Sequence, residues 1–141
     1  MKEFFDTSVL VAAFWKGHPD HVRSLRAVSA ANRKKSACAA HTLAEVYSTM
    51  TRLPVKDVIP PDQALLFVQE VRQRFAIVTL SEEDYLDEID RSSRLGIIGG
   101  RIYDALLLRC AAKVKSHIIY TWNLKDFRAI RPEFADLMRA P

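Results

Sequence analysis

Apolar positions recur along much of the chain at the spacing of amphipathic helices. The clearest example ends at Pro54 and has apolar side chains at i, i+3, i+4, i+7 and i+10, namely Leu43, Val46, Tyr47, Met50 and Leu53. Similar patterns predict helices over 9–15, from about 20 to 32, over 61–74, from Ser81 as a cap towards the glycines at 96–100, and over 102–115. The inward-facing residues expected in the second and fourth helices are Val22, Leu25, Ala27, Val28, Ala64, Leu65, Phe67, Val68 and Val71.

Short apolar or β-branched runs between these helices predict the strands of a sheet. They cover residues 2–6, 36–40, 76–80 and 117–121. Residues 124–140 contain no such run, and we expect a turn followed by short helical pieces there. Strands that alternate with helices indicate an α/β layered fold with a mainly parallel sheet, and 141 residues fit a single domain over 1–141.

The composition narrows the class of protein. No stretch approaches the roughly 20 apolar residues of a membrane span, and Asp6 interrupts the apolar run that a signal peptide needs, so we expect a cytoplasmic protein. Cys38 and Cys110 each lie in an apolar segment without other metal-ligating residues nearby, which predicts two reduced thiols in the core.

The charge pattern allows a polyanionic partner without requiring one. The net charge is +4, from 21 basic and 17 acidic side chains, and most of the basic residues fit solvated helix faces. Arg94 and Arg101 differ because they flank the glycine-rich loop at 96–100, which makes them better candidates for contacts with phosphate.

Three acidic residues near the ends of strands or the starts of helices each have a structural explanation. Asp6 follows the first strand, where an aspartate often forms a turn or caps a helix. Glu45 lies three residues after Thr42, the spacing of a capping box in which the acid bonds back to the helix start. Asp126 follows the last strong strand and fits a turn or a cap equally well.

Asp104 is harder to explain in this way. Helical spacing places it on the same face as Leu107, Leu108 and Ala111. A carboxylate on an apolar face needs a cation, a hydrogen-bond network or a metal ion as its partner, because burying it unpaired costs several kcal/mol.

The four acids gain meaning as a set. In a parallel sheet, the segments that carry them can converge beyond the carboxyl ends of the strands, where ligands usually bind. A divalent cation would neutralise the repulsion between them, and a site of oxygen ligands favours Mg²⁺ or Mn²⁺. The histidines, including His41, are scattered, which favours structural or solvated roles over a Zn²⁺ site.

Four segments follow one another along the chain in a familiar order. They are Phe5-Asp6-Thr7-Ser8-Val9-Leu10, Ala44-Glu45-Val46-Tyr47, Gly99-Gly100-Arg101-Ile102-Tyr103-Asp104-Ala105-Leu106-Leu107 and Thr121-Trp122-Asn123-Leu124-Lys125-Asp126-Phe127. In order and separation they resemble the signatures of PIN-domain ribonucleases, above all the toxins of VapBC toxin–antitoxin pairs. The resemblance implies a three-layer α/β/α sandwich with about five strands, Mg²⁺- or Mn²⁺-dependent cleavage of RNA, frequent homodimers and inhibition by a small antitoxin protein.

The resemblance also implies roles for individual residues. Asp6, Glu45 and Asp104 take the places of the family's metal-binding acids, and the fourth place is open between Asp126 and Asn123. The small hydroxyl residues that orient these acids would be Thr7 or Ser8, and Thr121.

The predicted reaction is metal-assisted hydrolysis of an RNA phosphodiester, with one ion held by Asp6 and Asp104 and a second near Asp126. The residues expected to hold flanking phosphates are Arg94, Arg101 and Lys125. Tyr103 or Trp122 could stack on an unpaired base, although a place in the core is the alternative for both.

Two other functions use the same residues. A phosphatase or phosphotransferase could have Asp6 as its nucleophile, but such sites typically carry a second acid two positions later, where this chain has Ser8. A non-catalytic module of the same fold that binds RNA or a protein would use the acids only as caps.

Overall fold

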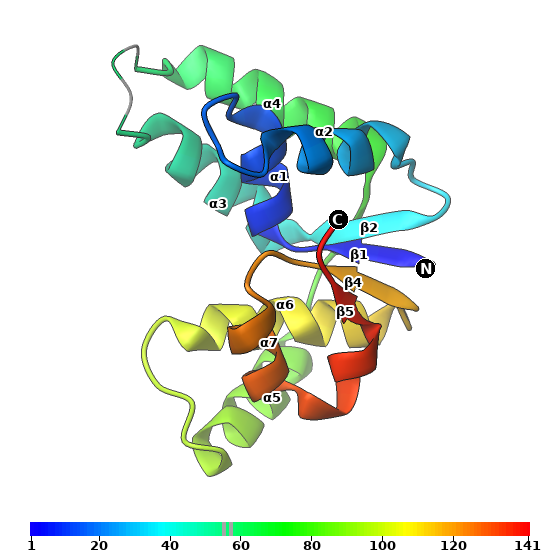
Figure 1. The fold of residues 1–141 in the computed structure, drawn as a ribbon. Helices are drawn as coiled ribbons and strands as arrows, with labels where there is room; N and C mark the ends of the chain where they lie inside the picture. The colour runs from blue at the N-terminus through cyan, green and yellow to red at the C-terminus, as the bar shows by residue number, and fades with distance from the viewer. Residues whose placement is uncertain (55, 57) are drawn as a thin grey trace.

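The computed structural model describes residues 1–54, 56 and 58–141. Within these residues, five parallel strands form one sheet in the order β3-β2-β1-β4-β5 (Figure 1). The strands are β1 (Glu3–Phe5), β2 (Ser36–Ala39), β3 (Ala76–Val78), β4 (Ile118–Tyr120) and β5 (Met138–Arg139). The predicted parallel sheet is therefore confirmed.

Helices cover both faces of the sheet, which gives the predicted α/β/α layers (Figure 1). One face carries α1 (Thr7–Phe14), α2 (His21–Ala30), α3 (Ala40–Thr51) and α4 (Pro61–Arg74). The other carries α5 (Glu82–Arg94), α6 (Arg101–Lys113), α7 (Leu124–Ile130) and the 3-10 helix η1 (Pro132–Leu137). No helix in the described part of the chain is long and apolar enough to cross a bilayer.

The central strand β1 joins two hydrophobic clusters. Successive side chains of a strand point to opposite faces of its sheet. Phe4 therefore packs with the cluster around α6, together with Leu108 and Phe127, whereas Phe5 packs on the other side, 4.9 Å from the ring of Phe75. Phe4 is fully buried and Phe5 is 1% exposed.

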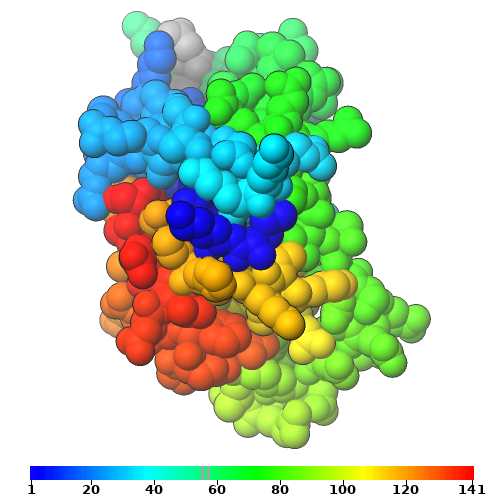
Figure 2. Space-filling view, turned by 90° about the vertical axis from the view of Figure 1, so that its right-hand side faces the viewer, coloured from blue at the N-terminus to red at the C-terminus, as the bar shows by residue number. Residues whose placement is uncertain are grey.

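The carboxyl ends of β1 and β4 lie side by side, because the amide of Asp6 donates to the carbonyl of Tyr120 at 2.9 Å. Figure 2 looks onto the opposite end of the sheet, where the first residues of the chain lie between the segment before β2 and the segment before β4. There the terminal amino group of Met1 donates to the carbonyl of Val114, and the amide of Glu3 donates to the carbonyl of Lys35.

The expectation for residues 124–140 was wrong in part. The end of segment 124–140, expected to be helical, pairs with β4 as the short strand β5. Two residues are too short a run for any periodicity to appear in the sequence. The helical pieces expected before it are confirmed as α7 and η1.

The inward faces of α2 and α4 are also narrower than predicted. Val22, Leu25 and Leu65 are exposed by 66%, 42% and 49%, because α2 packs mainly on α1, and α4 mainly on α3, rather than on the sheet. Tyr47 of α3 is likewise 40% exposed. The two cysteines are free and buried, as predicted.

Candidate functional site

The four predicted acids come from four elements that meet at the carboxyl ends of the strands. Asp6 follows β1, Glu45 is on α3, and Asp104 and Asp126 are in the first turns of α6 and α7. The pKa of Asp104 is raised to about 6, first by burial and then by the negative charges of Asp6, Glu45 and Asp126. The fold therefore brings the other three carboxylates within electrostatic range of Asp104.

Asp6 is held by two hydroxyl groups. Its Oδ2 atom accepts hydrogen bonds from Ser8 Oγ at 2.6 Å and from Thr121 Oγ1 at 2.9 Å. Each hydroxyl in turn accepts a hydrogen bond from a backbone amide after β4. The amide of Trp122 donates to Ser8 at 3.0 Å, and the amide of Asn123 donates to Thr121 at 2.9 Å. We call these two hydroxyls and two amides the Asp6 clamp.

The Asp6 clamp fixes the orientation of a carboxylate that is only 2% exposed. Asp6 also precedes the first residue of α1, but its side chain forms no cap hydrogen bond. Burial raises the pKa of Asp6, and the hydrogen bonds from Ser8 and Thr121 offset only part of that effect.

Glu45 does not belong to a capping box. Helix α3 begins at Ala40, so Thr42 lies inside the helix instead of at its cap, and that expectation was wrong. The Thr7 hydroxyl lies within hydrogen-bond distance of both the Thr42 hydroxyl, at 3.0 Å, and Glu45 Oε1, at 3.1 Å. Burial raises the pKa of Glu45, against the opposing effects of His41 and Thr7.

Asp104 stands at the head of a buried stripe, as its spacing predicts. Leu107, Leu108 and Ala111 are all at most 2% exposed. The positive charge of Arg101 lowers the pKa of Asp104, but by less than burial and the other acids raise it. Its negative charge is therefore poorly compensated by the protein.

The donor set suits a hard divalent cation, although its side chains do not close around one point. Among the described residues, no three His, Cys, Asp or Glu side chains are grouped tightly enough to enclose an ion. Carboxylate oxygens are nevertheless the ligands that Mg²⁺ and Mn²⁺ prefer, and a cation would relieve the charge that raises these pKa values.

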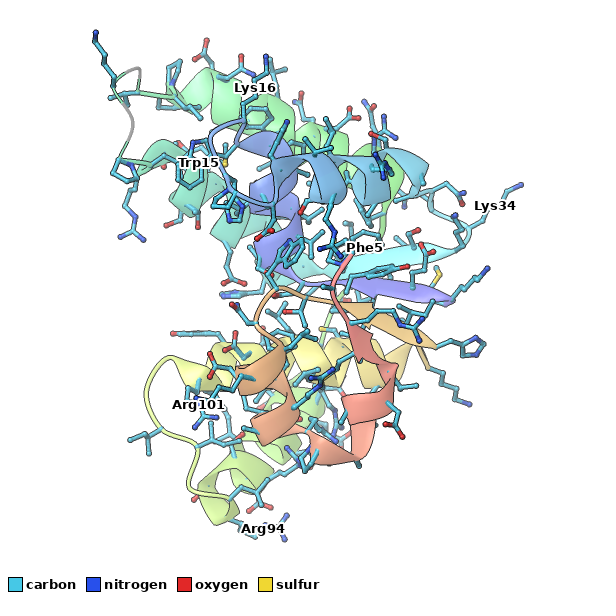
Figure 3. All side chains as sticks on the ribbon, in the orientation of Figure 1. Phe5, Trp15, Lys16, Lys34, Arg94 and Arg101 are labelled. Atoms are coloured by element: carbon cyan, nitrogen blue, oxygen red, sulfur yellow. The ribbon has the colours of Figure 1, made fainter. Side chains whose placement is uncertain are left out.

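The other predicted residues fall into two groups. Asn123, Lys125 and Asp126 are exposed around the start of α7, next to the Asp6 clamp, and the side chain of Asn123 forms no cap hydrogen bond. Arg101 begins α6, whereas Arg94 ends α5 at the tip of the molecule and forms an ion pair with Asp90 at 2.8 Å (Figure 3). Arg94 is therefore not brought together with the acids.

Sequence reasoning gave His41 no part in this site. Its Nε2 atom lies 3.8 Å from Glu45 Oε1, and its ring is stacked on that of Tyr103. The available signal was the spacing, since His41 precedes Glu45 by four residues on one helix and so lies on the same face.

Comparison with known proteins places this geometry in a family. Residues 4–131 match the PIN domain family. The chain is 34% identical over 116 residues to the ribonuclease VapC27 of Mycobacterium tuberculosis, an alignment that covers 80% of this chain and 79% of that protein. It is 31% identical over 125 residues to the ribonuclease VapC40 of the same organism, covering 89% and 87%.

Solved structures show the same fold at lower sequence identity. VapC20 of Mycobacterium tuberculosis, a toxin that cleaves the sarcin–ricin loop, superposes with a TM-score of 0.72 at 15% identity and covers 91% of this chain and 95% of its own. VapBC2 from Rickettsia felis gives a TM-score of 0.65 at 20% identity, with 99% and 98% covered. The family match, the two relatives and the fold together show that the chain belongs to the PIN-domain family, among the VapC ribonucleases.

Proposed function

We propose that the chain is a ribonuclease that cleaves RNA phosphodiesters with Mg²⁺ or Mn²⁺ and is the toxin of a toxin–antitoxin pair. The observation that carries the proposal is the convergence of Asp6, Glu45, Asp104 and Asp126, with the pKa of Asp104 raised to about 6. Acids that are buried or half-buried with little compensating charge, as Asp6, Glu45 and Asp104 are, fit a cation site better than helix caps. The ribonuclease relatives at 34% and 31% identity support the same reaction.

Each group of the site has a part in this reaction. Asp6 and Asp104 would hold the ion with help from Glu45, and Asp126 would approach it from α7. A divalent cation bound there supplies polarisation of a phosphoryl oxygen and a lowered pKa for water. The Asp6 clamp keeps one carboxylate in place during catalysis, which avoids the cost of reorganising it.

Basic residues would position the RNA through its phosphates. Arg101 and Lys125 are exposed on two helices that begin beside the acids. Such contacts hold the strand in register without reading its sequence. Arg94 would contact only RNA that extends towards the end of α5.

The toxin role implies protein partners. The solved VapBC complexes from Rickettsia felis and nontypeable Haemophilus influenzae resemble this chain in fold, with TM-scores of 0.65 in both cases. We extend their pairing to this chain and expect a cognate antitoxin, together with the homodimer and the cytoplasmic location expected from the sequence.

The proposal is tested with purified protein, a short single-stranded RNA and Mn²⁺. Asp6→Asn and Asp104→Asn should each lower the cleavage rate by at least about 100-fold, because each removes a negative metal ligand. Asp90→Asn is a matched control, since Asp90 pairs with Arg94 at the tip of the molecule. Cleavage that persists in EDTA, or in either variant, would contradict the metal mechanism.

Two further measurements separate the alternatives. Calorimetric titration with Mn²⁺ should show saturable binding that Asp6→Asn abolishes, whereas acids that serve only as caps would bind no ion. RNA binding without any cleavage would favour the non-catalytic module. A trapped phospho-aspartate at Asp6 would favour the phosphotransferase.

A further inference from the structure

Two aromatic rings face each other at the edge of the acidic site. His41 is near the start of α3 and Tyr103 is in the first turn of α6, with ring centroids 5.2 Å apart and planes inclined by 8°. Each ring shares a helix with one of the acids. His41 lies on α3 with Glu45 and contacts it at 3.8 Å, and Tyr103 lies on α6 directly before Asp104. We call these two rings the His41–Tyr103 pair.

The pair is not part of the core. Tyr103 is 48% exposed and the side chain of His41 is 38% exposed, so both retain open ring surface. This exposure rules out the core explanation for Tyr103 that the sequence allowed. Flat apolar surface open to solvent beside a polar site is typical of a binding surface.

The apolar surface continues beyond the pair. His41 also lines a small recess at the carboxyl ends of β2 and β3, together with Leu80, Tyr85 and Leu106. The nine residues that line this recess include no lysine, arginine or carboxylate. The recess therefore offers a phosphate no permanently charged partner, and most of its lining is apolar.

Trp122, the other aromatic residue considered from the sequence, already has partners for its ring and its N–H group. The guanidinium of Arg23 lies over the ring of Trp122, 5.2 Å from its centroid. The indole Nε1 of Trp122 donates to Ser24 Oγ at 2.8 Å. Trp122 therefore supports the turn after β4, and of these two aromatic residues Tyr103 is the one whose ring is open to a ligand.

We propose that the His41–Tyr103 pair is a stacking platform for one unpaired base of the RNA substrate, next to the phosphodiester that is cleaved. Proteins that bind single-stranded RNA commonly stack its bases on aromatic side chains. The edge of the base would point towards the apolar recess. This proposal rests on the proposed ribonuclease function and adds a site that favours a base at one position.

The test uses single-stranded RNAs in which one nucleotide near the cleaved bond is abasic. At one position, the unaltered protein should cleave the intact RNA roughly 5- to 100-fold faster than the abasic RNA, the range expected for one stacked base. Tyr103→Leu should abolish this preference, with the abasic RNA cleaved within about two-fold of the normal rate. His41→Leu also removes the contact with Glu45, so for that variant only the ratio of the two RNAs is read, and it should fall to about one. Tyr103→Phe should retain the preference because its ring can still stack.

Controls separate stacking from folding and from chemistry. Tyr47→Leu is the matched control, because Tyr47 is also an exposed tyrosine and lies two positions after Glu45, on the other side of α3. Circular dichroism should be the same for all variants, and Mn²⁺ titration should be the same for the Tyr103 and Tyr47 variants and the unaltered protein. Binding of the same RNAs to Asp104→Asn protein, measured by fluorescence anisotropy, reads the base preference without cleavage.

The outcomes distinguish the two proposals. An equal loss on intact and abasic RNA in Tyr103→Leu would overturn the platform, since it indicates a structural role. Equal cleavage of intact and abasic RNAs at every position by the unaltered protein would overturn the platform and leave the nuclease intact. Position-specific binding without any cleavage would support the platform and overturn the nuclease.

Discussion

At the scale of single residues, the Asp6 clamp shows how a buried carboxylate is held in one orientation. Thr121 is fully buried, donates to Asp6 and accepts from the amide of Asn123. A hydrogen bond to a charged group contributes about 1.5–3 kcal/mol. The clamp therefore supplies enough energy to hold one orientation of Asp6.

Replacing Thr121 tests this role. Thr121→Val keeps the shape but removes the hydroxyl, and we expect weaker Mn²⁺ binding and a cleavage rate lowered by about 10-fold or more. Thr121→Ser should restore both, because its hydroxyl can make the same two bonds. Steady-state kinetics with calorimetry checks this prediction, and equal behaviour of the two variants would contradict it.

The raised pKa of Asp104 predicts a pH-dependent stability. The folded state binds the proton of Asp104 more tightly than the unfolded state, whose carboxyl has its ordinary pKa of 3.8, so ionisation weakens the fold as pH rises from about 4 to about 6. Asp104→Asn cannot ionise and should be more stable than the unaltered protein near pH 7 by about 1 kcal/mol, a value reduced for solvent screening.

Urea unfolding in EDTA measures this difference. The stability gained by Asp104→Asn should disappear near pH 4, where the carboxyl is protonated in both states. A gain of the same size at both pH values would show that the charge of Asp104 is not its cause. Added Mn²⁺ should reverse the order of the two proteins above pH 6, because only the aspartate binds the ion tightly.

The sequence allowed the acids to be chosen but not all of their surroundings to be predicted. The apolar face of Asp104 is visible in its spacing to Leu107 and Ala111. The role of Thr42 is not visible in the sequence, because Thr42-Leu43-Ala44-Glu45 fits the start of a helix. Only the observed start of α3 at Ala40 excludes a capping box there. Local patterns do not report contacts between distant segments, such as that of Thr7 with Glu45.

At the scale of elements, a buried ion pair connects α5 to the end of α7. Glu88 of α5 is fully buried, and its two carboxylate oxygens contact Arg131 at 2.5 Å and Arg91 at 3.4 Å. Arg91 also donates to the carbonyl of Ile130 at 3.1 Å. Charges buried in this way depend strongly on their partners.

Removing both partners should cost less than the two single removals added together. Arg131→Met leaves Glu88 buried without its closest cation, and we expect a loss of about 3–5 kcal/mol in the free energy of unfolding. The double variant Glu88→Leu/Arg131→Met should lose clearly less than the sum of the two single variants. Denaturant unfolding of the four proteins checks this, and additive losses would argue against a coupled pair.

Most elements were predictable because their signals are local. Ser81 caps α5 as expected, and it does so through a reciprocal pair of bonds with Asp84, at 3.0 and 3.1 Å. The strand β5 escaped prediction because its pairing with β4 is set by tertiary contact alone. Val22 and Leu65 were placed inward because periodicity identifies an apolar face but not whether a partner covers it.

At the scale of the whole molecule, β1 couples the two sides of the sheet. Phe4 and Phe5 are adjacent in sequence but belong to separate hydrophobic clusters. Both tryptophans, Trp15 and Trp122, pack against the cluster that contains Phe5. Their fluorescence therefore reports mainly on one side of the sheet.

This arrangement allows the single-domain prediction to be tested. Phe4→Ala should destabilise the protein by about 3–5 kcal/mol, because it leaves a cavity in the cluster on the other side. In a single cooperative domain, the fluorescence and circular dichroism transitions should both shift to the same lower temperature. Two separate transitions would instead indicate that the layers unfold independently.

The position of β1 in the middle of the sheet also has a consequence for biosynthesis. Synthesis runs along the chain from β1 towards β4, and the Thr121 hydroxyl that holds Asp6 lies 115 residues further along. Asp104 and Asp126 are likewise made long after Asp6. A nascent chain therefore carries Asp6 well before its hydrogen-bond partner and the other site acids exist, and the complete site can form only once Asp126 has been added.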